Sequence, residues 1–388
     1  MKKVLINCSV LMVSAVVGLL LCEFVSRLVL NPANYFDVGM VKDDVLGAVP
    51  SPTARGGFDA WGFRNREVPE TAEIVAVGDS HTYGNTARME DSWPYVLGRL
   101  TGRHVYNMGM GGYGPNQYLY LSTNKALSLK PRIIIWGLYM GDDFENAFSI
   151  TYGLDHWAYL REHPVGQVSF NIWESETPPH PSWHKNMRIW LSRHSVVYQL
   201  LFHASLSGRV QGEVQIRKAS QLYPGVATSL IIPEKNILEA FRPNSMLARL
   251  DQDSPNVREG MRITFKLLAE MNDICQQNHV GFLVVVIPTK ETVFSDYLEH
   301  NPKLALSDVI DKLLANERLA RKRTFQFLTD SNIAYVDPLP ALKSSAEHEL
   351  YARTAGDMHP NKNGYRVIAE AVSEAVKRDA TLGVAQQR

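Results

Sequence analysis

A serine, a histidine and an aspartate stand out in this chain because together they could carry out covalent catalysis. Ser80 ends the segment 75–80, an apolar run followed by Gly-Asp-Ser, whereas Asp357 and His359 lie together near the C-terminus. A serine hydroxyl is a weak nucleophile until a base removes its proton, and the base works best when a third group orients it. We therefore expect Ser80 to be the nucleophile, His359 the general base and Asp357 the group that orients the imidazole.

Two more segments are candidates for stabilising the oxyanion of such a reaction. The glycine-rich segment 107–114 follows a second apolar run, and Gly141-Asp142-Asp143 follows a third. Glycines let backbone N–H groups approach a developing oxyanion without obstruction by side chains. In an open parallel sheet, the carboxyl ends of the strands gather the binding site at one edge. The four segments, in this order, predict an acyl-transfer enzyme.

Short apolar runs alternate with helical stretches from residue 74 onward. Two of the runs are nearly continuous in valine and isoleucine, which is typical of parallel strands covered on both faces. We expect strands at Ile74–Val77, Val105–Asn107, Ile133–Leu138, Phe282–Ile287 and Ala334–Val336. We expect helices at Ser92–Leu100, Asn116–Leu129, Val257–Asn278, Leu306–Ser331 and Lys362–Arg378. This β-α-β-α-β order, an interruption, then α-β-α-β-α predicts one α/β domain over about residues 74–379.

The interruption, about residues 150–255, is too long for a plain loop and shows no strong strand run. We expect a folded insertion, or cap, beside the active-site end of the sheet. A short insertion needs large apolar side chains to order itself, so we expect its tryptophans to pack inside it rather than to stack on sugars. These are Trp157, Trp173, Trp183 and Trp190.

Composition and charge argue against several classes of protein. The 40 basic and 40 acidic residues cancel, which does not indicate a nucleic-acid partner. Two of the three cysteines lie in the apolar N-terminus, so no disulfide is expected within the domain. Six histidines fall in the insertion. His180 and His184 are four residues apart, but Pro181 between them argues against a helical ligand pair. We therefore predict no metal.

The N-terminal segment 4–30 is expected to be a transmembrane anchor, followed by a connector over residues 31–73. Residues 4–22 are nineteen uncharged residues, and at ~1.5 Å per residue they come close to the ~30 Å hydrocarbon thickness. A cleaved signal and a buried core helix are the alternatives, and no convincing small-x-small site follows the run. Lys2 and Lys3 favour a cytoplasmic N-terminus, which in a bacterium places the domain in the periplasm, anchored to the inner membrane.

These motifs resemble those of the SGNH hydrolases, also called the GDSL esterase/lipase superfamily, over about residues 74–377. The resemblance implies a three-layer α/β/α, flavodoxin-like fold with a five-stranded parallel sheet and neither metal nor organic cofactor. It further implies that Ser80 and Gly112 donate backbone N–H groups to the oxyanion. The segments 61–64, 78–84 and 112–117 resemble membrane-anchored members linked to bacterial exopolysaccharide modification.

Two positions depart from the usual pattern of that family. Where it has Gly-x-Asn-Asp, with the asparagine donating to the oxyanion, this chain has Asp142, and a carboxylate repels an oxyanion. Asp142 helps only if it is protonated, or if a donor such as Asn146 replaces it; losing one donor costs on the order of 3 kcal/mol. Many members also have the acid three residues before the histidine, whereas Asp357 lies two before His359. His81 is a weaker candidate base, since adjacent side chains diverge.

These expectations combine into a membrane-anchored serine esterase whose substrate is an acylated carbohydrate, as in the deacetylation of an exopolysaccharide. A polysaccharide O-acetyltransferase using the same triad is one alternative, because the acceptor of the acyl group depends on how well the cap excludes water. A non-catalytic polysaccharide-binding or scaffold protein of an export assembly is the other, and Asp142 is the residue that favours it.

Overall fold

Five parallel strands form the central sheet of this chain, as expected. The computed structural model describes residues 2–36, 39–51, 58–162, 183–203, 206–354 and 356–378. The strand order is β4-β3-β5-β8-β9, the flavodoxin-like arrangement. The strands are β3 (Ile74–Gly78), β4 (Val105–Gly109), β5 (Ile133–Tyr139), β8 (Gly281–Ile287) and β9 (Ala334–Val336). All five predicted strands are thus confirmed: β9 has the predicted bounds, and the other four differ at one end by one or two residues.

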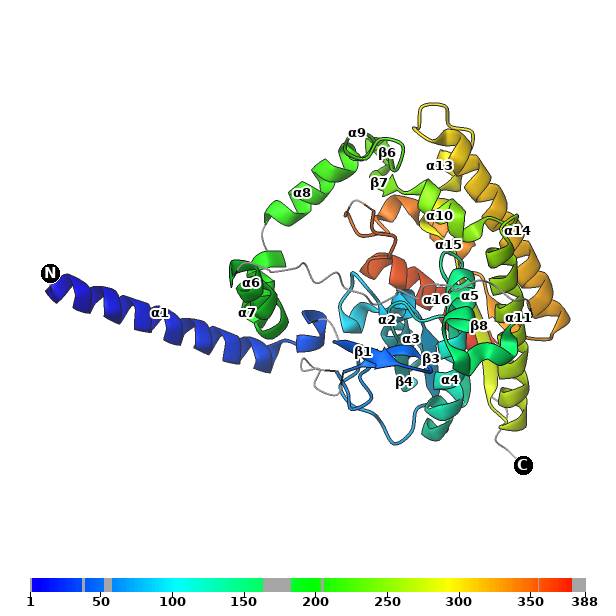
Figure 1. Ribbon diagram of the computed structural model, residues 1–388, viewed down its shortest axis with the longest axis horizontal. Coiled ribbons are helices and arrows are strands. Elements are labelled where there is room, and N and C mark those ends of the chain that lie inside the picture. The colour runs from blue at the N-terminus through cyan, green and yellow to red at the C-terminus, as the bar shows by residue number, and fades with distance from the viewer. Residues whose placement is uncertain are drawn as a thin grey trace.

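Helices cover both faces of the sheet and give a three-layer α/β/α domain (Figure 1). Successive strand residues point to opposite faces, so Val75 and Val77 join one apolar cluster while Ile74 and Ala76 join the other. The first face packs against α4 (Pro115–Asn124), α5 (Asp143–Gly153) and α11 (Pro255–Gln277). The second packs against α3 (Trp93–Thr101) and α16 (Lys362–Arg378), and α14 (Ser307–Asp330) contributes to both clusters.

The helix predicted over Asn116–Leu129 is interrupted, which corrects the expectation. The α-helix α4 ends at Asn124, and a 3-10 turn follows over Ala126–Leu129. Lys125 between them leaves the helical region with φ −130°, and its ammonium group lies 5.3 Å from the centre of the Trp61 ring. A cation over an aromatic ring is a favourable contact that compensates part of the lost helical turn.

The connector over residues 31–73 carries more structure than its sequence indicated. Strands β1 (Met40–Asp43) and β2 (Gly47–Pro50) form an antiparallel hairpin. Arg64 is buried and donates hydrogen bonds to the carbonyls of Gly84 and Ala87, in the loop after Ser80. The connector is therefore packed onto the domain close to the predicted nucleophile.

The inserted segment contains a β-hairpin that the sequence analysis did not foresee. Strands β6 (Thr228–Ile232) and β7 (Ile237–Phe241) pair antiparallel and are followed by α10 (Pro243–Leu250). The sequence shows no strong strand run here because two five-residue strands separated by a short turn give little periodicity to detect. The insertion's helices before this hairpin are α6 (Trp183–His194), α7 (Val196–His203), α8 (Leu206–Arg217) and α9 (Ala219–Leu222).

The tryptophans of the insertion do not share one environment. Trp157 is buried, and its indole N–H donates to the Val45 carbonyl at 2.8 Å, as packing predicts. Trp183 and Trp190 are instead exposed, so the prediction that they pack inside the insertion was wrong. Trp173, like His163 and His180, lies outside the described residues.

The N-terminus forms one long helix, α1 (Lys2–Val29), which projects from the domain (Figure 1). Its segment Ile6–Val29 is long and apolar enough to cross a membrane and is not buried against the rest of the chain. This exposure argues against the alternative of a buried core helix.

Packing of α5 against α11 predicts a strict size limit at Gly260. A Cβ at this position would lie 1.9 Å from the Phe144 carbonyl oxygen. We expect Gly260→Ala to lower the free energy of unfolding by about 1–3 kcal/mol, as overpacking does. Thermal unfolding of the detergent-solubilised chain measures this. The control is Gly39→Ala, where the new atom meets only Ser51 Cβ at 3.7 Å, and an equal loss in both variants would contradict the packing argument.

Candidate active site

The end of β3 presents Ser80 at the start of a short helix. Asp79 precedes α2 (Ser80–Tyr83) and caps it, because its Oδ1 accepts the His81 amide at 2.8 Å. The Asp79 side chain is itself almost fully buried. The Gly-Asp-Ser sequence therefore fixes the turn that presents the serine hydroxyl.

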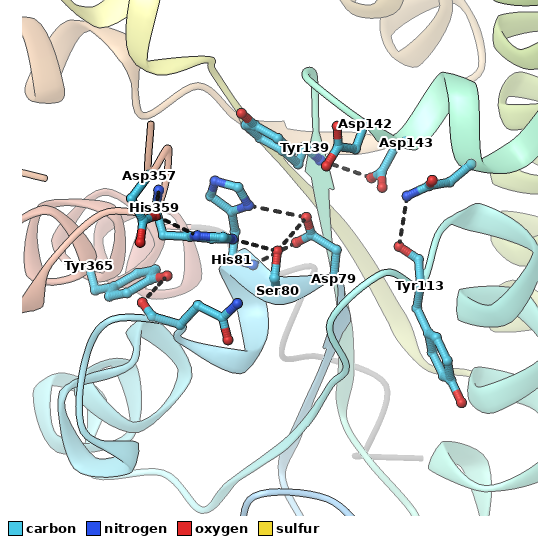
Figure 2. Close-up of polar contacts among 12 residues, drawn as sticks. Asp79, Ser80, His81, Tyr113, Tyr139, Asp142, Asp143, Asp357, His359 and Tyr365 are labelled. Carbon is cyan, nitrogen blue, oxygen red and sulfur yellow. Dashed lines mark hydrogen bonds and ion pairs between the residues drawn. The ribbon is translucent and has the colours of Figure 1, made fainter. Parts of the chain in front are cut away.

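Ser80, His359 and Asp357 form a continuous hydrogen-bonded triad (Figure 2). The Ser80 Oγ lies 2.8 Å from His359 Nε2, and His359 Nδ1 lies 2.8 Å from Asp357 Oδ1. The same Asp357 oxygen accepts the His359 backbone amide at 2.9 Å. Asp357 thus binds the imidazole of His359 from the same loop. A spacing of two residues between the acid and the histidine is therefore compatible with a triad.

The two loops of the triad are tied together outside the triad itself. The Thr86 hydroxyl donates to the Pro360 carbonyl at 2.7 Å, and the Tyr365 hydroxyl donates to the Asn85 carbonyl at 3.0 Å. Both bonds join the loop that follows Ser80 to the segment that follows His359. They hold together two hydrogen-bonded side chains, Ser80 and His359, that are 279 residues apart in the sequence.

Electrostatics favour an ionised acid in the triad. Burial opposes ionisation of Asp357, but the hydrogen bonds and positive charge supplied by His359 outweigh it and hold the pKa of this carboxyl below its usual value. A carboxylate there fixes the tautomer in which His359 Nδ1 carries the proton, which leaves Nε2 free to accept one from Ser80.

Lys290, which follows β8, connects the inserted hairpin to the loop that carries Asp357. Its ammonium group pairs with Glu239 of β7 at 2.7 Å and donates to the Asp357 carbonyl at 3.2 Å. Both side chains are almost fully buried, so each charge depends on the other for compensation. The insertion therefore contributes to the position of Asp357.

His81 is not placed to act on the serine. Its Nδ1 faces Asp79 Oδ2 at 3.1 Å, and its ring stacks on Tyr139 with centroids 3.7 Å apart. The ring is buried and lies 4.8 Å from that of His359. This contact packs one side of the His359 imidazole.

The sequence analysis expected the backbone amides of Ser80 and Gly112 to bind an oxyanion. An added Cβ on Gly111 would lie 3.8 Å from Ser80 Cβ, so the glycine turn is adjacent to the serine. Gly112 has φ 77°, a conformation that favours glycine. Within the described part of the chain, neither the Ser80 nor the Gly112 N–H has a hydrogen-bond acceptor.

Asp142, the position expected to supply an oxyanion donor, is paired with a cation. Arg249 Nη1 contacts Asp142 Oδ1, and Arg249 Nε lies 3.1 Å from Glu145 Oε2. Burial lowers the pKa of Arg249, but the two carboxylates outweigh it and raise the pKa above its usual value. The Asp142 charge that the sequence left unexplained is thus neutralised by a residue of α10, in the insertion.

Asn146 and Asp143 organise this side of the site. Asn146 Nδ2 donates a hydrogen bond to the Tyr113 carbonyl at 3.4 Å. One of its two amide hydrogens is therefore used in a contact with the glycine-rich loop. Asp143 is fully buried and accepts the Tyr118 hydroxyl and the Tyr139 amide. Burial and the charge of Asp79 raise the pKa of Asp143 well above its usual value.

A cavity of about 130 Å³ opens beside the triad loop. Its lining is about equally polar and apolar. The polar side chains are Arg242, Ser245, Arg249, Lys290, Glu291 and Asp357. The Arg242 guanidinium lies on the backbone of Gly356, where a Cβ would come within 2.4 Å of it. Oε2 of the buried Glu291 has no hydrogen-bond partner among the described residues.

Sequence reasoning missed Arg242, Arg249, Lys290 and Glu291 as members of this site. Each lies outside the segments that carry recognisable motifs, and two come from the insertion, which has no strong periodicity. The unusual carboxylate at Asp142 was the one signal that a compensating cation should exist. No group of three or more metal-ligating side chains occurs among the residues that the structure describes.

Comparison with known proteins gave matches only among solved structures. No family model and no curated protein sequence matches the chain. A member of the lipolytic G-D-S-L family from Veillonella parvula is 12% identical, with 79% of this chain and 98% of that chain covered and a TM-score of 0.37. A GDSL-like lipase from Bacteroides thetaiotaomicron is 10% identical (80% and 92% covered, TM-score 0.36).

A catalytic mutant of an acetylxylan esterase from Geobacillus stearothermophilus is also similar. It is 12% identical, with 80% of this chain and 97% of that chain covered and a TM-score of 0.36. The family expected from the motifs is therefore represented among the matched structures. At such identities and TM-scores the similarity carries no argument about chemistry, which rests on the geometry described above.

The Asp142–Arg249 pair predicts a specific pattern of loss and rescue. Asp142 occupies the position where an oxyanion donor was expected, and Arg249→Gln would leave its carboxylate without a partner cation. We therefore expect kcat on an aryl acetate to fall by about 10- to 100-fold, at most as much as the loss of an oxyanion donor. Adding Asp142→Asn to this variant should recover most of the lost kcat. Equal activity of Arg249→Gln and the parent, or failure of the second substitution to restore it, would show that the charge does not act on the reaction.

Glu291 predicts a pH-dependent effect on stability. Burial raises the pKa of Glu291 to about 7 from its ordinary 4.5, so the folded chain keeps a proton that the unfolded chain loses between these pH values. Stability therefore falls as pH rises through this window, by on the order of 3 kcal/mol. The melting temperature of Glu291→Gln relative to that of the parent should therefore rise between pH 5 and pH 8. The control Glu67→Gln, at an exposed position, should show no such rise. A pH-independent difference would contradict the assignment.

Proposed function

We propose that this chain is a serine ester hydrolase that acts through an acyl-Ser80 intermediate. The observation that carries the proposal is the hydrogen-bonded sequence from Ser80 Oγ through His359 to Asp357. Among the described residues, the amides of Ser80 and Gly112 also have no acceptor. This set contains a nucleophile, a base, an orienting acid and an oxyanion site, the four parts that acyl transfer requires.

The first half of the reaction forms the acyl-enzyme. His359 Nε2 accepts the Ser80 proton while Ser80 Oγ bonds to the acyl carbon, and the resulting oxyanion accepts hydrogen bonds from the amides of Ser80 and Gly112. Asp357 stabilises the imidazolium, which then gives its proton to the departing alcohol oxygen as the ester bond breaks.

The second half regenerates the serine. His359 accepts a proton from water as the water oxygen attacks the acyl carbon, and it returns that proton to Ser80 Oγ when the acid leaves. A sugar hydroxyl in place of this water gives an O-acyltransferase with the same residues. Whether water or a sugar hydroxyl accepts the acyl group therefore depends on which of them the insertion allows to reach the acyl-enzyme.

We propose an acylated carbohydrate as the substrate, as in an exopolysaccharide. Support comes from the cavity beside the triad, where Arg242 and Glu291 offer polar groups to a hydroxyl-rich ligand and apolar side chains line the rest. The acetylxylan esterase similar to this chain is named for an acetylated polysaccharide, which is consistent with this substrate class. We also propose that the protein works within an assembly for polysaccharide biosynthesis or export.

We propose further that α1 anchors the chain in a bacterial inner membrane with the domain on the periplasmic side. Lys2 and Lys3 precede the apolar segment and favour a cytoplasmic N-terminus. Glu23 near the end of α1 accepts the amides of Val196 and Val197, at 3.0 Å each. A helix that contacts the folded insertion is better explained as an anchor than as a segment removed during export.

Hydrolysis of an aryl acetate by the full-length chain in detergent tests the triad. We expect Ser80→Ala and His359→Ala each to lower kcat by a factor on the order of 10⁴ or more, since triad members act as a unit. The control is Ser128→Ala, a serine substitution at an exposed position, which should keep the activity of the parent. Asp79→Asn would not serve as a control because Asp79 caps α2.

The same assay separates the alternatives. Loss of activity in both triad variants, with acetate released to water, supports the hydrolase, whereas acetyl transfer to an added oligosaccharide faster than release of acetate supports the acyltransferase. A folded parent that releases no acyl group to either acceptor would favour the non-catalytic binding protein.

A further inference from the structure

Helix α6 of the insertion exposes an apolar face that nothing in the described chain covers. Trp183, Met187 and Trp190 are 65%, 48% and 58% exposed. Their spacing of four and then three residues places them on one side of the helix. Leu201 of the adjacent α7 is 67% exposed as well. Large aromatic side chains left exposed at helical spacing mark an interaction surface rather than a solvated one.

This face lies beside the end of the apolar N-terminal helix. Figure 1 shows α6 and α7 next to the C-terminal part of α1. Glu23 accepts the Ser195 hydroxyl at 2.8 Å, in the junction between α6 and α7. Arg27 donates to the His194 carbonyl at the end of α6. The two helices of the insertion are therefore attached to α1 by named polar contacts.

The position of these contacts along α1 sets the depth at which α6 would lie in a bilayer spanned by α1. Residues 4–22 are uncharged, and at ~1.5 Å per residue they span about 28 Å, close to the hydrocarbon thickness. Glu23 is the first charged residue after this stretch. Its contacts with Ser195 and Val196 hence occur where a bilayer spanned by α1 changes from hydrocarbon to headgroups.

The chemistry of α6 suits that depth. Tryptophan is enriched at membrane interfaces because its ring is apolar and its N–H is polar. The sequence of α6, WHKNMRIWLSRH, contains three Lys or Arg residues and neither Asp nor Glu, which favours contact with anionic headgroups. Arg188 is exposed on this helix.

We infer that α6 is an interfacial helix whose face of Trp183, Met187 and Trp190 is inserted in the surface of the bilayer that α1 spans. The inference rests on the proposed anchoring of α1. With both helices in the membrane, the insertion is held at two places, which fixes how the cavity beside the triad is presented relative to the membrane surface. The occupant of this face is a lipid surface containing anionic headgroups.

Fluorescence quenching in vesicles tests the inference directly. The full-length chain is reconstituted in vesicles of phosphatidylcholine and phosphatidylglycerol, with or without bromine on the acyl chains. We expect brominated lipid to quench tryptophan emission, and the double variant Trp183→Phe, Trp190→Phe to lose most of this quenching. Trp61→Phe, at a half-buried position on the domain, is the matched control and should keep it.

Each outcome has a defined meaning because phenylalanine preserves the apolar face and the aryl acetate assay reports on folding. Quenching of the same size in the parent and the double variant overturns the inference. An absence of quenching in a chain that floats with the vesicles also overturns it; added iodide then distinguishes a solvated face from one covered by protein. A chain that does not float with the vesicles contradicts the anchor itself, and with it the proposed location.

Discussion

The hydrogen bond between Ser80 and His359 is the constraint on which the rest of this structure depends. It joins two groups 279 residues apart at 2.8 Å, and proton transfer tolerates little variation in that distance. Parallel strands place Ser80 at one edge of the sheet, and the capped turn at Asp79 holds its hydroxyl there. Contacts from Thr86 and Tyr365 then fix the histidine loop against the serine loop, so the fold supplies the pre-organisation that the chemistry needs.

Charge compensation is the second theme of the site, and the insertion supplies it. Arg249 neutralises Asp142 at the position where a carboxylate would oppose an oxyanion. Lys290 binds the Asp357 carbonyl while pairing with Glu239 of the inserted hairpin. The insertion therefore contributes side chains to the proposed active site, and its attachment to α1 links that site to the proposed membrane surface.

The sequence predicted the elements whose signal is local and missed those that depend on distant contacts. The buried strands were identifiable because continuous valine and isoleucine runs such as β5 are typical of a covered parallel sheet. The triad could be predicted because Gly-Asp-Ser and Asp-x-His occur after recognisable elements. The Arg249–Asp142 pair could not be predicted, since its partners are 107 residues apart and Arg249 lies in a segment of weak periodicity. The exposure of Trp183 and Trp190 was likewise invisible, because the sequence does not show which apolar side chains find a partner.

The most direct test of the central claim is the mass of the intact chain after treatment with a fluorophosphonate, which labels a serine only when its hydroxyl is activated. The account predicts one added phosphonyl group in the parent, located on Ser80, and none in His359→Ala, where Ser80 is present but has no base. Labelling of Ser80 at the same rate without His359, or no labelling of a folded parent, would contradict the claim that these residues form a working catalytic triad.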